Sequence, residues 1–241
     1  MNNEKTSLKK IISNHFFDFF MLFLAVSLGF LVDNYRDEQN SKSIATEMAL
    51  DVIEDIKSDT AAIQDMLLHC EHKQHRLDTL FNLINDDITH FDDTVIYRLS
   101  AYVNKRPWFE RHGSTIYLLL NAGYLSSFSK DASVCITTYD LECQKLFALL
   151  EIEKSTLNNK VVPFLQQVFH TENFVSIIHS NTFVCKPELR NWNQDTRWLY
   201  HNYITEMQIL NNNILQYYQQ LLAQATLTIQ ILQKEYMLEQ G

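Results

Sequence analysis

The stretch IEDIKSDTAAIQDMLLHCEHKQHRLDTLFNLI, residues 53–84, decides the fold of this chain. Steps of three and four residues place side chains on one face of an α-helix, so a stripe with that spacing predicts a long helix with a coiled-coil-like core face. Such a helix must bury its stripe against a partner. The positions of the stripe are Ile53, Ile56, Thr60, Ile63, Leu67, Cys70, Gln74, Leu77, Phe81 and Ile84.

The partner helix is predicted at the other end of the sequence, in residues 195–238, which contain neither glycine nor proline. The same spacing recurs there at Met207, Leu210, Ile214, Tyr217 and Leu221. The whole chain has only four glycines and three prolines in 241 residues, whereas average usage is about 12% for the two together. We therefore expect an all-α protein, an elongated antiparallel helical bundle built on two long helices.

Shorter helices are predicted between the two long ones, at 92–103, 113–123 and 130–154. Asp residues cap the first of them, Ser114 is the expected N-cap of the second, and Gly123 is its expected C-terminal residue. The third runs toward Pro163, where we expect a break or a kink, because proline cannot donate the helical hydrogen bond.

An apolar stretch, HFFDFFMLFLAVSLGF at residues 15–30, precedes the long helix. Residues 11–32 carry one formal charge, that of Asp18. As a helix they would reach about 33 Å, enough for a hydrocarbon core of about 30 Å. A cleaved signal peptide is the alternative, but no small-x-small cleavage site follows. The sequence predicts a transmembrane helix over 11–33.

The remaining domains follow from this span, with a tail at 1–10 and a helical domain at 34–241. Lys5, Lys9 and Lys10 lie on the short side of the span, and Arg36 and Lys42 lie beyond its far end. The positive-inside rule then predicts a cytoplasmic N-terminus. In a bacterium this would make the chain an inner-membrane protein with its C-terminal domain in the periplasm.

Asp18 is the unusual residue of the predicted span. A charged side chain at the centre of a membrane helix costs about 2.5–3.5 kcal/mol. Asp18 either contacts a partner helix or a hydrated path, or it marks a span that begins only near Phe19. A span from Phe19 to Val32 would be too short to cross, which favours an intramembrane partner contact for Asp18.

Composition narrows the remaining classes of function. The net charge of -9 argues against nucleic acid as a partner, because phosphate contacts need clustered Lys and Arg. The four cysteines lack C-x-x-C spacing and are expected mainly as buried free thiols, with disulfides as the alternative. In HCEHKQH, residues 69–75, the histidines resemble a solvated helix face more than a metal site. We expect no metal and no cofactor.

Two segments concentrate aromatic and basic side chains, KRPWFERHG at 105–113 and RNWNQDTRWLYHNY at 190–203. Such side chains favour protein interfaces, and the alternative is that the aromatic rings plug the end of the bundle. The candidate interaction surface comprises Arg106, Trp108, Phe109, Arg111, Trp192 and Trp198. Neither a G-x-S-x-G motif nor a phosphate-binding glycine-rich loop occurs, so we expect no catalytic residue and a protein that is not an enzyme.

Two blocks of the sequence, residues 17–39 and 114–140, carry a recognisable pattern. In FDFFMLFLAVSLGFLVDNYRDEQ, residues 17–39, an acid opens the span, a glycine lies near its end, and Asn, an aromatic residue and two acids follow. Asp18, Gly29 and residues 34–38 hold those places, with Asp instead of Glu and Tyr instead of Trp. The second block is STIYLLLNAGYLSSFSKDASVCITTYD, residues 114–140. The two blocks resemble an uncharacterised single-pass membrane family of Bacteroidota, and the resemblance implies a membrane-anchored helical domain without an enzymatic assignment.

These features together predict a non-enzymatic, membrane-anchored structural or accessory subunit of a bacterial envelope complex. Its expected partners are the membrane and other membrane-protein subunits, or further copies of itself as a homo-oligomer. Assembly is expected through Asp18 and the coiled-coil-like helices. The alternatives are a periplasmic sensor or ligand-binding bundle that signals through a partner, and an ion-coupled motor accessory that uses Asp18.

Overall fold

The computed structural model describes residues 2–85, 92–105 and 109–236, with side chains from Phe19 onward. The secondary structure in these ranges is entirely helical, which confirms the predicted all-α fold. The elements are α1 (Asn2–Asn85), α2 (Asp93–Val103), α3 (Ser114–Asn121), the 3-10 turn η1 (Tyr124–Ser127), α4 (Lys130–Thr156), the π-helical turn η2 (Leu157–Val161), α5 (Val162–Val168), α6 (Thr171–Ser180) and α7 (Gln194–Glu235).

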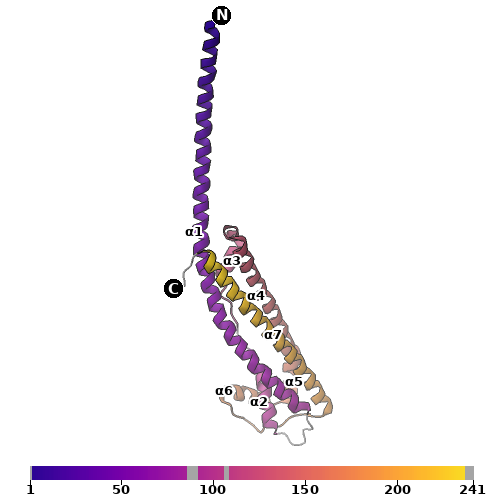
Figure 1. The fold of residues 1–241 in the computed structure, drawn as a ribbon. Coiled ribbons are helices and arrows are strands. Elements are labelled where there is room, and N and C mark those ends of the chain that lie inside the picture. The colour runs from indigo at the N-terminus through magenta and orange to yellow at the C-terminus, as the bar shows by residue number, and fades with distance from the viewer. Residues whose placement is uncertain (1, 86–91, 106–108, 237–241) are drawn as a thin grey trace.

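Three long helices form the body of the molecule (Figure 1). Helices α1 and α4 run away from the N-terminal end, and α7 returns antiparallel to both, in contact with each of them. The short helices α2, α5 and α6 lie at the far end of the body, and α3 lies at its near end. The pairing of α1 with α7 is the antiparallel contact that the two apolar stripes predict.

The stripe of α1 faces the core as its spacing requires. Six of its ten positions are buried, and the other four, Thr60, Leu67, Gln74 and Phe81, are half-buried. On α7, Met207, Ile214 and Leu221 are buried. The buried face of α1 begins at Ala45, and small side chains there let the helices approach closely.

The short helices differ from expectation mainly at their caps. Asp92 caps α2 through a 2.9 Å hydrogen bond from the Thr94 N–H. Ser114 is not an N-cap, because α3 already begins at this residue and Gly113 precedes it. Gly123 ends this helical segment as predicted, with a φ of +78° that favours glycine.

Pro163 does not break the chain of helices after α4. The backbone widens into the π-helical turn η2 and then continues as α5, with Pro163 in its first turn. A proline ring in a regular α-helix would clash with the carbonyl of residue 159, and a widened turn just before the proline accommodates it. The expected break is therefore a single wide turn.

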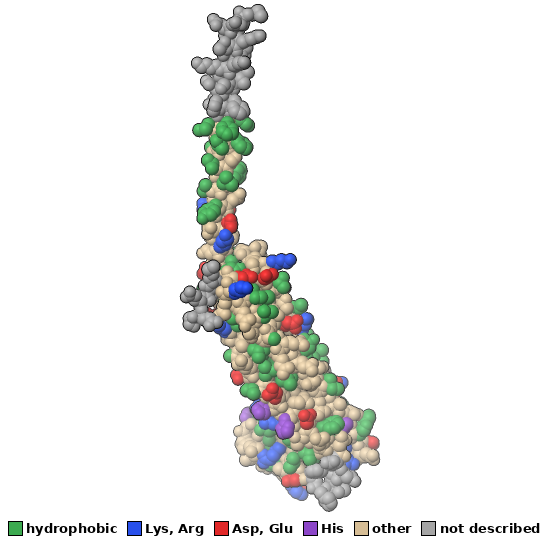
Figure 2. Space-filling view, in the orientation of Figure 1, with side chains coloured by type: hydrophobic (Ala, Val, Ile, Leu, Met, Phe, Trp, Pro, Cys, Tyr) green, Lys and Arg blue, Asp and Glu red, His purple; other side chains and the backbone are tan. Residues whose placement is uncertain are grey.

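The first half of α1 stands outside the body. The large apolar side chains between Phe19 and Val32 are exposed, and they form the apolar collar above the body in Figure 2. In the described part of the chain, α1 is the one helix long and apolar enough to cross a membrane. The helix is unbroken from there to Asn85. The side chain of Asp18 lies outside the described residues.

The four cysteines are free thiols, as the sequence predicts. Cys70, Cys135 and Cys143 are buried in the body, and Cys185 is half-buried. Three of them therefore act as small apolar core side chains.

Candidate functional site

The predicted interaction surface is divided by the structure. Arg106 and Trp108 lie outside the described residues. Phe109 is only 7% exposed and packs against Phe147 and Tyr218. The prediction that it belongs to an outer interaction surface was therefore wrong. The ring enters the core because the loop that carries it folds back onto the bundle.

Of the remaining surface candidates, only Trp198 is open. Arg111 lies inward, with 14% of its side chain exposed, so the prediction that it belongs to an outer surface was also wrong. Trp192 is half-buried and packs edge-on against Phe169 and Tyr200, beside the apolar core of the far half. The Trp198 side chain is 67% exposed.

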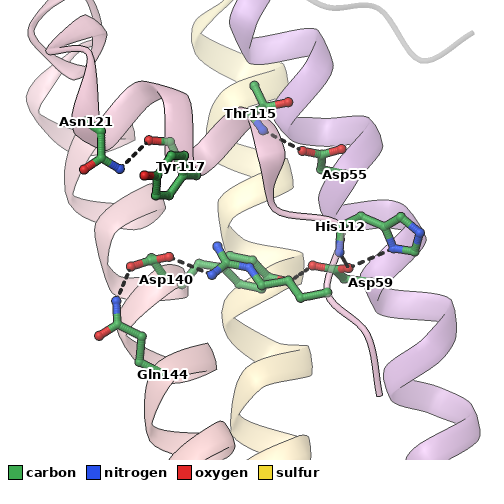
Figure 3. Close-up of polar contacts among 10 residues, drawn as sticks. Asp55, Asp59, His112, Thr115, Tyr117, Asn121, Asp140 and Gln144 are labelled. Carbon is green, nitrogen blue, oxygen red and sulfur yellow. Dashed lines mark hydrogen bonds and ion pairs between the residues drawn. The ribbon is translucent and has the colours of Figure 1, made fainter. Parts of the chain in front are cut away.

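A buried carboxylate, that of Asp59, holds the loop of residues 109–113 against α1 (Figure 3). It accepts a 2.6 Å hydrogen bond from the backbone N–H of His112 and another of 2.6 Å from the Tyr139 hydroxyl. The His112 Nδ1 lies 3.3 Å from the same carboxylate. Asp59 thus joins α1, the loop and α4 at one point.

Arg111 adds a second contact between this loop and α4. Its guanidinium makes a 2.7 Å ion pair with Asp140 and lies over the Tyr139 ring, 5.4 Å from the centroid. Burial, with the nearby Cys143 and Asp59, raises the pKa of the Tyr139 hydroxyl, which therefore stays protonated and donates. We call Asp59, Arg111, His112, Tyr139 and Asp140 the loop clamp.

Midway along the body, a layer of polar side chains separates two apolar clusters. Lys73 on α1 and Glu153 on α4 form a 2.6 Å ion pair, with both side chains only 5% exposed. Asn211 on α7 donates hydrogen bonds to the Cys70 carbonyl at 2.9 Å and to the Gln74 side chain at 3.0 Å. We call Lys73, Gln74, Glu153 and Asn211 the polar layer.

A cavity of about 20 Å³ adjoins the polar layer, lined among others by Met66, His69, Cys70, Lys73 and Tyr218. This is room for about one water molecule. The His69 Nε2 is buried there without a hydrogen-bond partner in the described part of the chain. Burial and the nearby Lys73 charge lower the pKa of His69.

The loop clamp and the polar layer each lie beside a buried cysteine. Burial raises the pKa of Cys70 to about 12 and that of Cys143 to about 11, so both thiols are poor nucleophiles near neutral pH. Within the described ranges, no group of three or more His, Cys, Asp or Glu side chains could hold a metal ion. His72 and His75 lie exposed on α1.

Sequence reasoning missed the buried charges, although their spacing carried a signal. Asp59 lies between Ile56 and Ile63, and Lys73 lies between Cys70 and Leu77, with the same steps of three and four as the apolar stripe. A charge at such a position is expected to be buried and paired. The partners, Tyr139 and Glu153, lie 80 residues away in each case, beyond the reach of a local pattern.

No family model, curated protein or solved structure matches this chain. The resemblance to the Bacteroidota membrane family therefore stays a prediction, and functional inference rests on the residues of this chain.

Proposed function

We propose that this chain is a non-enzymatic, membrane-anchored structural or accessory subunit of a bacterial envelope complex. In this proposal residues 11–33 cross the inner membrane, the N-terminus is cytoplasmic and the helical body is periplasmic. The partners are other membrane-protein subunits or further copies of the chain. The proposal also includes membership of the single-pass family that the two sequence blocks resemble.

One observation carries the proposal: α1 is a single helix from Asn2 to Asn85 that joins an exposed apolar segment to the core of the body. Large apolar side chains covering every face of a lone helix are stable in lipid and unfavourable in water. Because no loop separates the two parts, anchor and body move together. This suits a scaffold or an assembly factor.

The polar segment of α1 just beyond the apolar one supports a role in assembly. Residues 33–40 are exposed all round and lie between the apolar collar and the body. The Glu38–Lys42 ion pair, at 2.7 Å, lies in this region and is more than half exposed, so it contributes little. No described part of the body covers this segment, so its surface is open to a neighbouring subunit.

Asp18 provides the first test. The full chain would be extracted from native membranes in mild detergent, weighed as a particle, and analysed for proteins that travel with it. We expect a defined complex in which Asp18→Leu reduces assembly and Asp18→Asn, which can still form hydrogen bonds, reduces it less. Ser27→Leu, which removes a polar group from the same span, is the matched control.

Equal assembly of the wild type, Asp18→Asn and Asp18→Leu would show that Asp18 is not an assembly contact. A particle that contains one copy of the chain and no other protein would contradict the subunit role itself.

A sensor that signals through a partner subunit is the second candidate, and the polar layer favours it. Removing one partner of a buried ion pair costs several kcal/mol, so a ligand that disturbed this layer would change the packing of α1 against α4. Ligand-dependent stabilisation of the protein in a screen of metabolites would support the sensor, and thermal unfolding that no compound shifts would argue against it.

A further inference from the structure

A cleft opens at the far end of the body, where α1 ends and α7 begins. Its volume is about 410 Å³, and it is lined by Asn85, Gln194, Arg197, Trp198, His201 and Asn202, together with Ile84. Clefts that hold small ligands range from about 300 to 1,000 Å³, so this one has the size of a binding site for one or a few sugar-sized units.

Trp198 gives the cleft an aromatic wall. Its side chain is 67% exposed, whereas the neighbouring Trp192 is packed into the core by Phe169 and Tyr200. The indole ring has a large apolar face in contact with water, and covering that face with a ligand lowers the free energy.

The polar side chains around Trp198 are available for a ligand. Within the described residues, the side chains of Asn85, Gln194, Arg197 and Asn202 make no hydrogen bond or ion pair. The amide of Asn211, by contrast, is used by the fold itself, in the polar layer. Arg197 is half-buried, and a carboxylate could form a bidentate pair with its guanidinium.

From this constellation we propose that the cleft binds an acidic saccharide. The C–H face of a sugar ring stacks on Trp198, a sugar carboxylate pairs with Arg197, and the amides of Asn85, Gln194 and Asn202 take hydroxyl or acetamido groups. Each of these five side chains then has a matching group on the ligand. The proposal goes beyond the assembly role and does not depend on it.

A saccharide fits the cleft better than a protein surface does. A stable protein interface buries about 800 Å² on each partner around an apolar centre. Here a single exposed indole stands among amides and a cation, which suits a small polar ligand with one apolar face. Two sources share this chemistry, a cell-wall glycan that carries N-acetylmuramate and an extracellular polysaccharide that carries uronate.

The test is a titration of saccharide probes into the full chain in detergent, with tryptophan fluorescence as the readout. The probes are a disaccharide of N-acetylglucosamine and N-acetylmuramate, a galacturonate trimer, and neutral cellotriose. We expect saturable binding of at least one acidic probe, weaker binding of cellotriose, and a loss of about tenfold or more in affinity for Trp198→Ala. The better acidic probe identifies the source.

Two further variants separate the parts of the proposal. Arg197→Gln should bring the affinity for the acidic probe close to that for cellotriose, because the charge-assisted pair is lost. Because Trp198→Ala also removes a fluorophore, its affinity is measured by calorimetry. The control is Tyr117→Ala, which truncates an aromatic side chain that is 71% exposed on α3 and should bind like the wild type.

Three results would overturn the proposal. These are no binding of any acidic probe, binding that Trp198→Ala leaves unchanged, and capture of a protein by a photo-crosslinker at position 198 in place of saccharide binding. The complex isolated in detergent is measured without saccharide, so failure of the cleft proposal and failure of the assembly proposal remain distinguishable.

Discussion

Lys73 and Glu153 form a 2.6 Å ion pair inside the body, and they join α1 to α4 across 80 residues of sequence. The two helices each pack chiefly on α7, so this pair links the outer members of the three-helix body. Both side chains are 5% exposed. Removing one partner leaves the charge of the other buried, and the free-energy cost of that buried charge lowers the stability of the protein.

Lys73→Met should therefore destabilise the protein by about 3–5 kcal/mol. The double variant Lys73→Met/Glu153→Leu should cost less than the sum of its single variants, because the charge that each single variant leaves buried is also removed. Urea unfolding of the three variants, followed by circular dichroism, measures these free energies.

Lys160 and Glu206 supply the matched control for this cycle. They also form a 2.6 Å pair between distant parts of the chain, but their side chains are 48% and 37% exposed. Lys160→Met should cost no more than about 1 kcal/mol. Equal losses for Lys73→Met and Lys160→Met would contradict the assignment of the polar layer as a buried pair.

Tyr139→Phe tests the loop clamp. The change removes the hydroxyl that donates to Asp59 and leaves the carboxylate, which is fully buried, short of a donor. We expect a loss of about 1–3 kcal/mol in the free energy of unfolding. Tyr117→Phe, at an exposed tyrosine of α3, should change it by no more than about 0.5 kcal/mol.

His69 should make stability depend on pH. Burial and Lys73 lower its pKa below 6.5, so the unfolded chain binds a proton before the folded one does as pH falls. Stability from this group is full above the unfolded pKa and is lost as pH falls from about 6.5 toward the lower folded pKa.

His69→Gln should accordingly lose less stability than the wild type between about pH 7.5 and 5.5. His72→Gln, at an exposed histidine of the same helix, should retain the wild-type slope. Thermal unfolding across this range compares the three proteins, and parallel curves for the wild type and His69→Gln would show that His69 titrates alike in both states.

The cysteines should differ in reactivity. With a pKa of about 12 for Cys70 and about 11 for Cys143, fewer than about one in a hundred of these thiols is ionised at pH 8, and both are buried. Cys185, which is half-buried, should be alkylated first by iodoacetamide, as mass spectrometry of the modified peptides would show. In urea all four should react, and equal rates for Cys70 and Cys185 in the native protein would contradict the buried core.

The long helices were predictable because their information is local. The steps of three and four along residues 53–84 and the scarcity of glycine and proline suffice to place α1 against α7. Asp59 and Lys73 fit the same steps, yet their roles depend on Tyr139 and Glu153, which only the folded chain brings near. Phe109 illustrates the opposite error, because an aromatic residue in a basic segment looks the same in sequence whether its ring lies outside or inside.

Because α1 is unbroken, a rotation at one end of the helix displaces the other end. From Val32 to Asn85 the helix extends about 80 Å at 1.5 Å per residue. A tilt of the exposed apolar segment, residues 19–32, by about 5° would carry the far end, with the cleft beside Trp198, through about 7 Å. In the membrane-anchored arrangement that we propose, a partner bound at that end of the body would therefore also tilt the helix in the lipid.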